Sequence, residues 1–173
     1  MSWIDNKWPA PGYRKQVRAA PQAPSVRYVA CKSCQARLCE TAFMEAHQVC
    51  SVCGYHHLMS AHERLDLLTS GAHYSLLGEN FQANDYLSFC DTQPYAQRLV
   101  AAKKKTNLSE AVLSVKSSID GIAVAMSIFD FRFIGGSLGA AAGDRVALAI
   151  QAAIDQNMPY ICVTASGGAR MQE

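Results

Sequence analysis

Two pairs of cysteines, each separated by two residues, constrain the chain more than any other feature. The short spacing lets one tight turn present two sulfur atoms to a single metal ion. Four thiolates complete the tetrahedral shell that Zn²⁺ favours and leave no position open for water, so we expect one structural zinc ion. The predicted ligands are Cys31, Cys34, Cys50 and Cys53.

The residue after each cysteine pair is expected to need a left-handed backbone. Gly54 suits this conformation after the second pair, whereas Gln35 after the first pair pays about 1–2 kcal/mol for it. The first turn is therefore predicted to be the weaker one. Residues 28–57 hold too little apolar surface to order themselves, so we expect metal binding to be coupled to folding.

The other cysteines and the nearby histidines have a simpler interpretation. Seven cysteines form an odd set, and the sequence does not begin with a secretory pattern, which argues against a disulfide framework. Cys39, Cys90 and Cys162 are expected to be buried or partly buried thiols. Because four cysteines already fill the metal shell, His56 and His57 are expected at the surface or behind the ligands.

Charge is distributed unevenly along the chain. Residues 1–37 contain seven Lys or Arg and one acid, although the net charge of the whole chain is +2. Residues 1–27 also contain four prolines and no apolar period, so we predict a flexible basic tail there. Such a tail is either simply solvated or meets nucleic acid or an acidic partner surface.

The rest of the chain divides into two stretches. Residues 58–108 are predicted to be a helical connecting region, in which a capping box from Ser60 to Glu63 opens one helix. A second helix is expected from about Tyr95 to Lys105. The chain contains no uninterrupted apolar stretch of the roughly 18 residues that a membrane helix needs. We therefore predict a cytoplasmic protein without a membrane segment.

Residues 109–173 are predicted to form an α/β core. Asp120-Gly121 lies between two β-prone runs and is typical of a tight hairpin. An Ala-rich helix is expected over residues 138–156, followed by a short strand over residues 160–163 and the start of another helix over residues 169–173. Hairpin, helix, strand and helix in this order indicate an α/β core of crossover units.

Two glycine-rich segments follow predicted strands. Consecutive glycines in Ser166-Gly167-Gly168 let a ligand approach the backbone, and the unpaired N–H groups can hold a thioester oxygen as it becomes an enolate. The alternative is a plain tight turn. Ser166 is not predicted to be a hydrolase nucleophile, because Thr164 stands where the G-x-S-x-G pattern requires glycine.

The earlier segment, over residues 133–139, contains three glycines and one serine. It is predicted to be either a wall against a ligand or a close contact between a helix and a strand. It lacks the G-x-G-x-x-G fingerprint, and its preceding strand is expected to belong to a hairpin and not to a parallel crossover unit, which excludes a dinucleotide site. No Gly-Lys-Ser/Thr follows, which excludes a P-loop. The candidate substrate-binding residues are Gly135, Gly136, Ser137 and Gly139.

Several segments, in order, resemble the beta subunit of the acetyl-CoA carboxylase carboxyltransferase. They are MSWI at residues 1–4, the four-cysteine segment, MSAHER at 59–64, DFRFIGGSLG at 130–139 and ASGGARMQE at 165–173. The resemblance implies a zinc ribbon over residues 28–57. It also implies a crotonase-like core, a ββα superhelix, of which residues 109–173 are the first part, incomplete at the C-terminus.

The same resemblance implies an activity and its partners. A carboxyl group passes from carboxybiotin on the biotin carboxyl carrier protein to acetyl-CoA, giving malonyl-CoA for fatty acid biosynthesis. An alpha carboxyltransferase subunit, in an α2β2 assembly, and a biotin carboxylase are the other implied partners. Gly167 and Gly168 match the family position whose N–H groups are thought to stabilise the enolate, and Arg170 is expected to anchor the turn.

Two further interpretations remain open. Because the family's beta chain continues past this point, the chain is interpreted as a fragment or a truncated form that is inactive by itself. It is alternatively a zinc-ribbon module that binds nucleic acid or a partner subunit. A carboxyltransferase or decarboxylase for another acyl-CoA is the remaining alternative.

Overall fold

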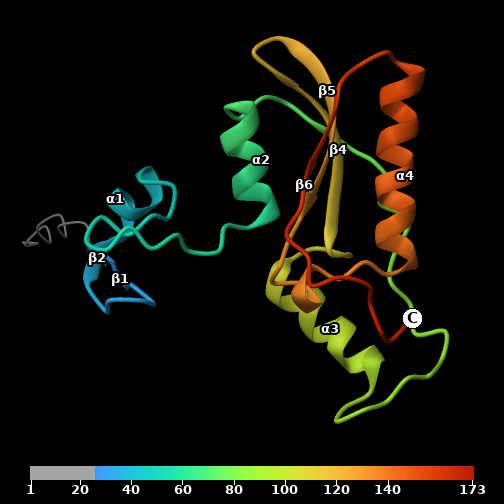
Figure 1. The fold of residues 1–173 in the computed structure, drawn as a ribbon, viewed down its shortest axis with the longest axis horizontal. Helices are drawn as coiled ribbons and strands as arrows, with labels where there is room; N and C mark the ends of the chain where they lie inside the picture. Colours follow the sequence, from blue (N-terminus) through green and yellow to red (C-terminus); the bar gives the residue numbers. More distant parts are fainter. Residues whose placement is uncertain (1–25) are drawn as a thin grey trace, which may run out of the picture.

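The computed structural model describes residues 26–173, in which a small cysteine-bearing module leads by an extended segment into an α/β core (Figure 1). The basic tail predicted for residues 1–27 lies outside the described residues except for its last two. The segment boundaries predicted near residues 57 and 108 remain predictions. None of the helices between residues 26 and 173 is long and apolar enough to cross a membrane.

The module is built on two similar turns. Strand β1 (Tyr28–Ala30) pairs antiparallel with β2 (Arg37–Cys39), and the first cysteine pair lies in the turn between them. Helix α1 (Glu40–Glu45), which the sequence analysis did not identify, leads to the second turn. Gln35 and Gly54, one after each pair, have φ angles of 59° and 70°, so the predicted left-handed backbone is confirmed at both turns.

Two helices connect the module to the sheet. In α2 (Ala61–Thr69), Ser60 Oγ accepts the Glu63 N–H at 3.1 Å and the Glu63 carboxylate accepts the Ser60 N–H at 2.8 Å, which confirms the predicted capping box. Helix α3 (Tyr95–Thr106) confirms the second predicted helix to within one residue at its end. Both helices bury one apolar face in the main core.

The sheet has four strands in the order β3-β4-β5-β6. The predicted hairpin is present, and its two turn residues, Asp120 and Gly121, have φ angles of 49° and 81°, as a primed turn requires. The short strand predicted over residues 160–163 is also present. The strands are β3 (Ser75–Leu76), β4 (Val112–Ile119), β5 (Ile122–Phe129) and β6 (Tyr160–Val163).

Strand β5 belongs to two motifs at once. It forms the hairpin with β4 and also pairs parallel with β6 through the crossover helix α4 (Ala140–Asp155). The expectation that this strand lies outside a parallel crossover unit is therefore wrong. Strand β5 pairs with β4 along one side and with β6 along the other. A local pattern of apolar residues does not reveal the second pairing. The missing fingerprint still excludes a dinucleotide site.

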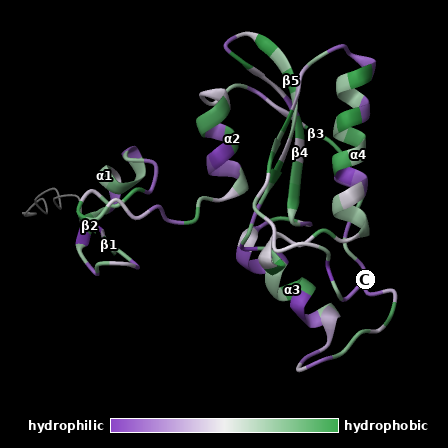
Figure 2. Ribbon diagram, in the orientation of Figure 1, coloured by the Kyte–Doolittle hydropathy of each residue, from purple (hydrophilic) through white to green (hydrophobic). Residues whose placement is uncertain are grey.

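Helices cover both faces of the sheet: α2 lies against one face and α4 against the other (Figure 1). The last six residues of β5 are all buried, which explains why this strand is almost continuously apolar (Figure 2). A main core joins the sheet to α2 and α3, and a smaller one under α4 contains Val112, Phe129 and Ala142.

The helix predicted to begin at residues 169–173 is absent. Ala169 instead forms a parallel bridge with Leu138, and the Arg170 N–H donates to Leu138 O at 2.8 Å. Only a turn follows, closed by the Glu173 N–H on Arg170 O at 3.4 Å. These contacts tie the backbone of residues 169 and 170 to Leu138, so no helix begins there.

Candidate functional site

The four predicted metal ligands lie together in the cysteine-bearing module. Their sulfur atoms are all within 4.8 Å of one another, with 3.7 Å between Cys31 and Cys53 and 3.8 Å between Cys34 and Cys50. A zinc ion with four bonds of about 2.3 Å to sulfur requires edges of about 3.8 Å between its ligands. The donor set and its spacing therefore fit a tetrahedral zinc site.

The ionisation of these thiols also favours a bound cation. The backbone N–H of Cys34, with smaller contributions from His57 and Ser33, lowers the pKa of the Cys31 thiol to about 5 despite its burial. For Cys34, the Ala36 N–H favours the thiolate, but the neighbouring cysteines outweigh it and raise the pKa of this exposed thiol to about 12. Cys31 therefore forms its thiolate more readily than Cys34, and a bound cation would favour the charged form of both.

The environment of the cluster is asymmetric. Cys31 and Cys50 are buried beside Leu38 and Phe43, whereas the second cysteine of each pair is exposed. His57 packs edge-on against Phe43, with 4.9 Å between ring centroids. Within residues 26–173, the only group with metal-ligand spacing is that of the four cysteines, so no histidine joins it.

The remaining cysteines differ from their prediction in part. Cys39 is partly buried, as expected, and its sulfur lies 3.1 Å from Thr41 Oγ1. Cys90 and Cys162 are exposed instead of buried. Cys162 is exposed because β6 is the edge strand of the four-stranded sheet in the described residues. These three thiols lie outside the metal-ligand group.

The two glycine-rich segments meet at one edge of the sheet. We call residues 134–139 the first glycine loop and residues 164–168 the second glycine loop. They follow β5 and β6, which are parallel neighbours, so both lie where these strands end, the usual place for ligands in such sheets. Two backbone hydrogen bonds of 2.9 Å join them: the Gly167 N–H donates to Gly135 O, and the Leu138 N–H donates to Gly168 O.

The glycines of these loops serve two different purposes. A Cβ atom on Gly136 would lie 2.0 Å from Ala165 O, and one on Gly139 would lie 2.2 Å from the Glu173 carboxylate. Both glycines therefore permit close internal packing, but against a loop and a side chain and not between a helix and a strand, as one of the two alternatives predicted. Gly135 and Gly168 have φ angles of +64° and +114°, and a Cβ atom on either would face open space. A ligand can approach the backbone there.

The two predicted oxyanion donors are exposed but have partners within the loops. The Gly167 N–H is taken by Gly135 O, and the Gly168 N–H donates to Ser166 Oγ at 3.0 Å. The Ser166 hydroxyl donates back to Gly168 O at 3.4 Å, so its contacts stay within its own loop. This arrangement agrees with the exclusion of a serine nucleophile.

A buried ion pair lies directly behind the glycine loops. The side chains of Arg170 and Glu110 are both fully buried, and the guanidinium contacts both carboxylate oxygens. Burial by itself would lower the pKa of Arg170. The contacts with Glu110 and Tyr95 have the larger effect and raise that pKa above its usual range, so the guanidinium stays charged. Arg170 therefore anchors the turn, as expected from the sequence.

The buried partners of Arg170 were not predicted from the sequence. Glu110 precedes the apolar start of β4, and Tyr95 begins α3, where nothing in the local pattern indicates a polar contact. Glu173 accepts hydrogen bonds from Tyr95 Oη at 2.5 Å and from the Ala140 N–H at 2.6 Å. One weak signal was available, since an acid amid apolar residues just before a strand usually has a buried partner.

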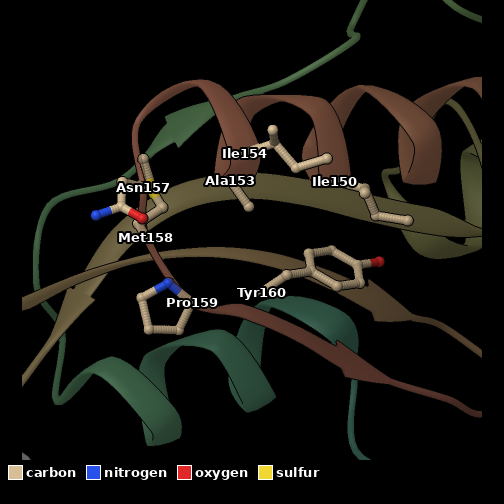
Figure 3. Close-up of a pocket in the computed structure, with 7 residues that line it drawn as sticks. All are labelled: Ile150, Ala153, Ile154, Asn157, Met158, Pro159 and Tyr160. Carbon is tan, nitrogen blue, oxygen red and sulfur yellow. The ribbon is translucent and has the colours of Figure 1, made fainter.

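A largely apolar groove lies away from these loops. It has a volume of about 600 Å³ and is formed where α4 ends and β6 begins (Figure 3). Its lining is largely apolar, and the side chains of Ile150 and Ile154 face the Tyr160 ring across it. The groove contains none of the predicted site residues. Of the predicted glycine-loop residues, Gly167 and Gly168 are exposed, whereas Gly136 and Ser137 are buried.

Comparison with known proteins gives a consistent result. Residues 80–173 match the family model described as the carboxyl transferase domain. The acetyl-coenzyme A carboxylase carboxyl transferase subunit beta of Psychrobacter cryohalolentis is 39% identical over 100% of this chain and 54% of its own length. The subunit of the same name from Pelobacter propionicus is 36% identical over 100% of this chain and 60% of its own length. The chain thus spans about half the length of these relatives.

A solved structure shares the fold. The crystal structure of transcarboxylase 12S with methylmalonyl-coenzyme A and methylmalonic acid bound superposes with a TM-score of 0.52 at 21% identity. The match covers 78% of this chain and 22% of the other. The chain therefore has the α/β fold of the carboxyl transferases, next to a four-cysteine cluster.

Proposed function

Because the chain belongs to the carboxyl transferase family, we propose that it is part of the beta subunit of an acetyl-CoA carboxylase carboxyltransferase. The observation that carries this proposal is the pair of glycine loops joined at the ends of β5 and β6. Gly135 and Gly168 there leave backbone open to a ligand. The core is proposed to be the first part of a crotonase-like ββα superhelix.

The proposed reaction moves a carboxyl group from carboxybiotin to the methyl carbon of acetyl-CoA, giving malonyl-CoA for fatty acid biosynthesis. Carboxybiotin supplies CO₂, and the biotin nitrogen that is freed accepts the proton from the methyl group. This leaves little acid–base work for the side chains of this chain. Their remaining task is to orient the thioester and to stabilise negative charge on its oxygen.

We assign that task to the N–H groups of Gly167 and Gly168. The Gly168 N–H contacts only the Ser166 hydroxyl, which can rotate away and release the donor to a thioester oxygen. The Gly167 N–H must exchange Gly135 O for the same oxygen. Gly168 is therefore the more available donor of the two.

The first glycine loop is proposed to form the facing wall of the substrate site. Gly135 offers open backbone to the ligand, and Gly136, Ser137 and Gly139 shape the loop from behind. Support for these three is indirect: Gly136 and Gly139 allow close packing against the second glycine loop and Glu173, and Ser137 is held by Arg170.

We propose that Cys31, Cys34, Cys50 and Cys53 hold one structural zinc ion in a ribbon. Their sulfur spacing and their chemistry support this assignment. A zinc ion there would link the two cysteine turns and stabilise a module whose own apolar core is small. Four protein ligands leave no open position, so no catalytic step is assigned to it.

The proposed partners follow from the role of a beta subunit. We propose an alpha carboxyltransferase subunit in an α2β2 assembly, a biotin carboxyl carrier protein and a biotin carboxylase, all acting in the cytoplasm. The names of the relatives as subunits support a multi-subunit complex. Because the chain spans about half of those relatives, we expect the 173 residues alone to be inactive.

Nucleic-acid binding by the ribbon is not the function that the geometry favours. Over residues 26–57 only Arg27, Lys32 and Arg37 are basic, and they are offset by Glu40 and Glu45. Arg37 also lies over the Tyr28 ring, 4.9 Å from its centroid, so this aromatic face is already covered. The exposed tyrosines among the described residues of this module are Tyr28 and Tyr55, which is few for a strand-binding surface that stacks successive bases.

The deciding experiment combines the chain with an alpha partner and measures carboxyl transfer between malonyl-CoA and free biotin. We expect turnover with the partner and none without it, and Ser166→Ala is expected to retain it within about threefold. Turnover only with another acyl-CoA would support the alternative substrate. No turnover, together with salt-dependent RNA or DNA binding, would support the ribbon module instead.

A further inference from the structure

We propose that Arg170 is a positioning residue for carboxyl transfer, which holds the two glycine loops in register through its buried contacts with Glu110 and Ser137. The inference rests on the proposed function, because it concerns the surface to which the thioester is assigned. Arg170 itself lies behind this surface and does not reach the substrate.

Arg170 connects both glycine loops. It lies two positions after the second loop, and its guanidinium reaches back to the first, donating to Ser137 O at 2.7 Å and to Ser137 Oγ at 3.2 Å. Its backbone N–H donates to Leu138 O at 2.8 Å. One residue therefore fixes the first loop by main-chain and side-chain contacts together.

The same guanidinium is tied to two helices. It donates to Glu173 and to Tyr95 Oη, each at 3.2 Å, and Tyr95 begins α3. Glu173 in turn accepts the Ala140 N–H, the first of α4. The ends of α3 and α4 and the two glycine loops thus share one hydrogen-bonded centre, and a displacement of any of them disturbs the others.

Stability alone does not explain this ion pair. Replacing a buried pair by apolar residues of similar volume is often neutral or stabilising, because both charges lose their hydration. What an apolar pair cannot replace is the set of directed hydrogen bonds to Ser137. The first loop needs such support because Ile134, a β-branched residue, has a φ angle of +46°. This strained backbone conformation persists only where surrounding contacts hold it in place.

The variants separate positioning from stability. Arg170→Met leaves the buried Glu110 carboxylate without its cation and with only the Ala111 N–H as a donor, so this variant is expected to unfold easily. The double variant Arg170→Met with Glu110→Met replaces the pair by apolar side chains, so it is expected to melt close to the wild type while losing the contacts to Ser137. Arg145→Met is the matched control: Arg145 is also a buried arginine, but it binds Phe81 O, Val112 O and Ser109 Oγ and contacts neither glycine loop.

The measurements are kcat and KM for malonyl-CoA in the complex with the alpha partner, below the melting temperature of each variant. The double variant is expected to lose about 100-fold in kcat with KM changed less than about threefold, since small misplacement of a binding surface has effects of this size. Arg145→Met is expected to keep its kcat within about threefold.

A double variant that melts like the wild type and keeps its kcat would overturn the positioning role. Failure of the proposed function has a different signature, namely no carboxyl transfer by the wild-type complex. In that case amide hydrogen exchange tests whether Arg170 holds the two glycine loops in register. Faster exchange of the Leu138 and Gly167 amides in the double variant supports this role, and unchanged exchange overturns it.

Discussion

Asp130, at the end of β5, accepts a hydrogen bond of 3.1 Å from the backbone N–H of Ala61, the first residue of α2. The carboxylate is buried and is also bound by the Arg132 guanidinium. It therefore caps a helix that lies 69 positions earlier in the chain. This contact fixes α2 against the sheet and leads to the first prediction.

Asp130→Asn is expected to lower the free energy of unfolding by about 1–3 kcal/mol at pH 7, because a charged acceptor is lost from a buried site. Burial raises the pKa of Asp130, but the contacts with Arg132 and Ala61 outweigh it and leave that pKa below its usual range. Because the pKa of Asp130 is lower in the folded than in the unfolded protein, its charge stabilises the fold at pH values above the unfolded-state pKa. This stabilisation is lost as the pH falls through the folded-state pKa.

Urea unfolding of Asp130→Asn at several pH values checks this. The difference from the wild type is expected to shrink below about pH 4, the usual range for an unfolded Asp. Asp144→Asn, at an exposed position of α4, is the control and is expected to unfold like the wild type. A pH-independent difference would contradict the electrostatic origin of the effect.

Alanine at Gly136 and Gly135 is expected to act very differently. Gly136→Ala places a Cβ atom against Ala165 O and strains a left-handed backbone, so we expect a loss of at least about 3 kcal/mol. In Gly135→Ala the new Cβ atom meets open space, so only the strain of the positive φ angle is expected to destabilise the fold, by about 1 kcal/mol. Thermal unfolding of both variants measures the difference in their free energies of unfolding. Equal losses of stability would show that the backbone at Ala165 shifts easily to make room for the new Cβ atom.

Removal of metal is expected to unfold the ribbon while the α/β core remains folded. The cysteine-bearing module buries only a few apolar side chains, whereas the core under α2, α3 and the sheet is extensive. Native mass spectrometry should show one zinc ion per chain, and a chelator should remove it. Amide exchange should then rise over residues 28–57 only. Cys31→Ser is expected to mimic the chelator and Cys90→Ser to have no effect.

Gln35→Gly is expected to slow zinc release from the ribbon. Gln35 has a φ angle of 59°, a conformation that costs a side-chain-bearing residue about 1–2 kcal/mol and costs glycine almost nothing. Part of this gain is offset by the greater freedom of glycine in the unfolded chain. Transfer of zinc to a chromophoric chelator measures the rate. Ala36→Gly, one residue later, is the control and is expected to release zinc no more slowly than the wild type.

The sequence alone predicted those elements that short stretches of chain control. The two cysteine turns, the capping box at Ser60 and the hairpin at Asp120-Gly121 are each defined by residues no more than a few positions apart. Their hydrogen bonds and φ angles depend on local residue types, so a local pattern is sufficient to find them. The gathering of the four cysteines followed from the spacing that a tetrahedral ion requires.

Only the tertiary structure decided how distant segments meet. The pairing of β5 with β6, the joining of the two glycine loops and the contact of Arg170 with Glu110 span tens of residues, and no local preference selects these partners. The expected helix at residues 169–173 gave way to contacts with Leu138 for the same reason. A buried polar group is stable only with its particular partner, and that partner is known only when the whole core is assembled.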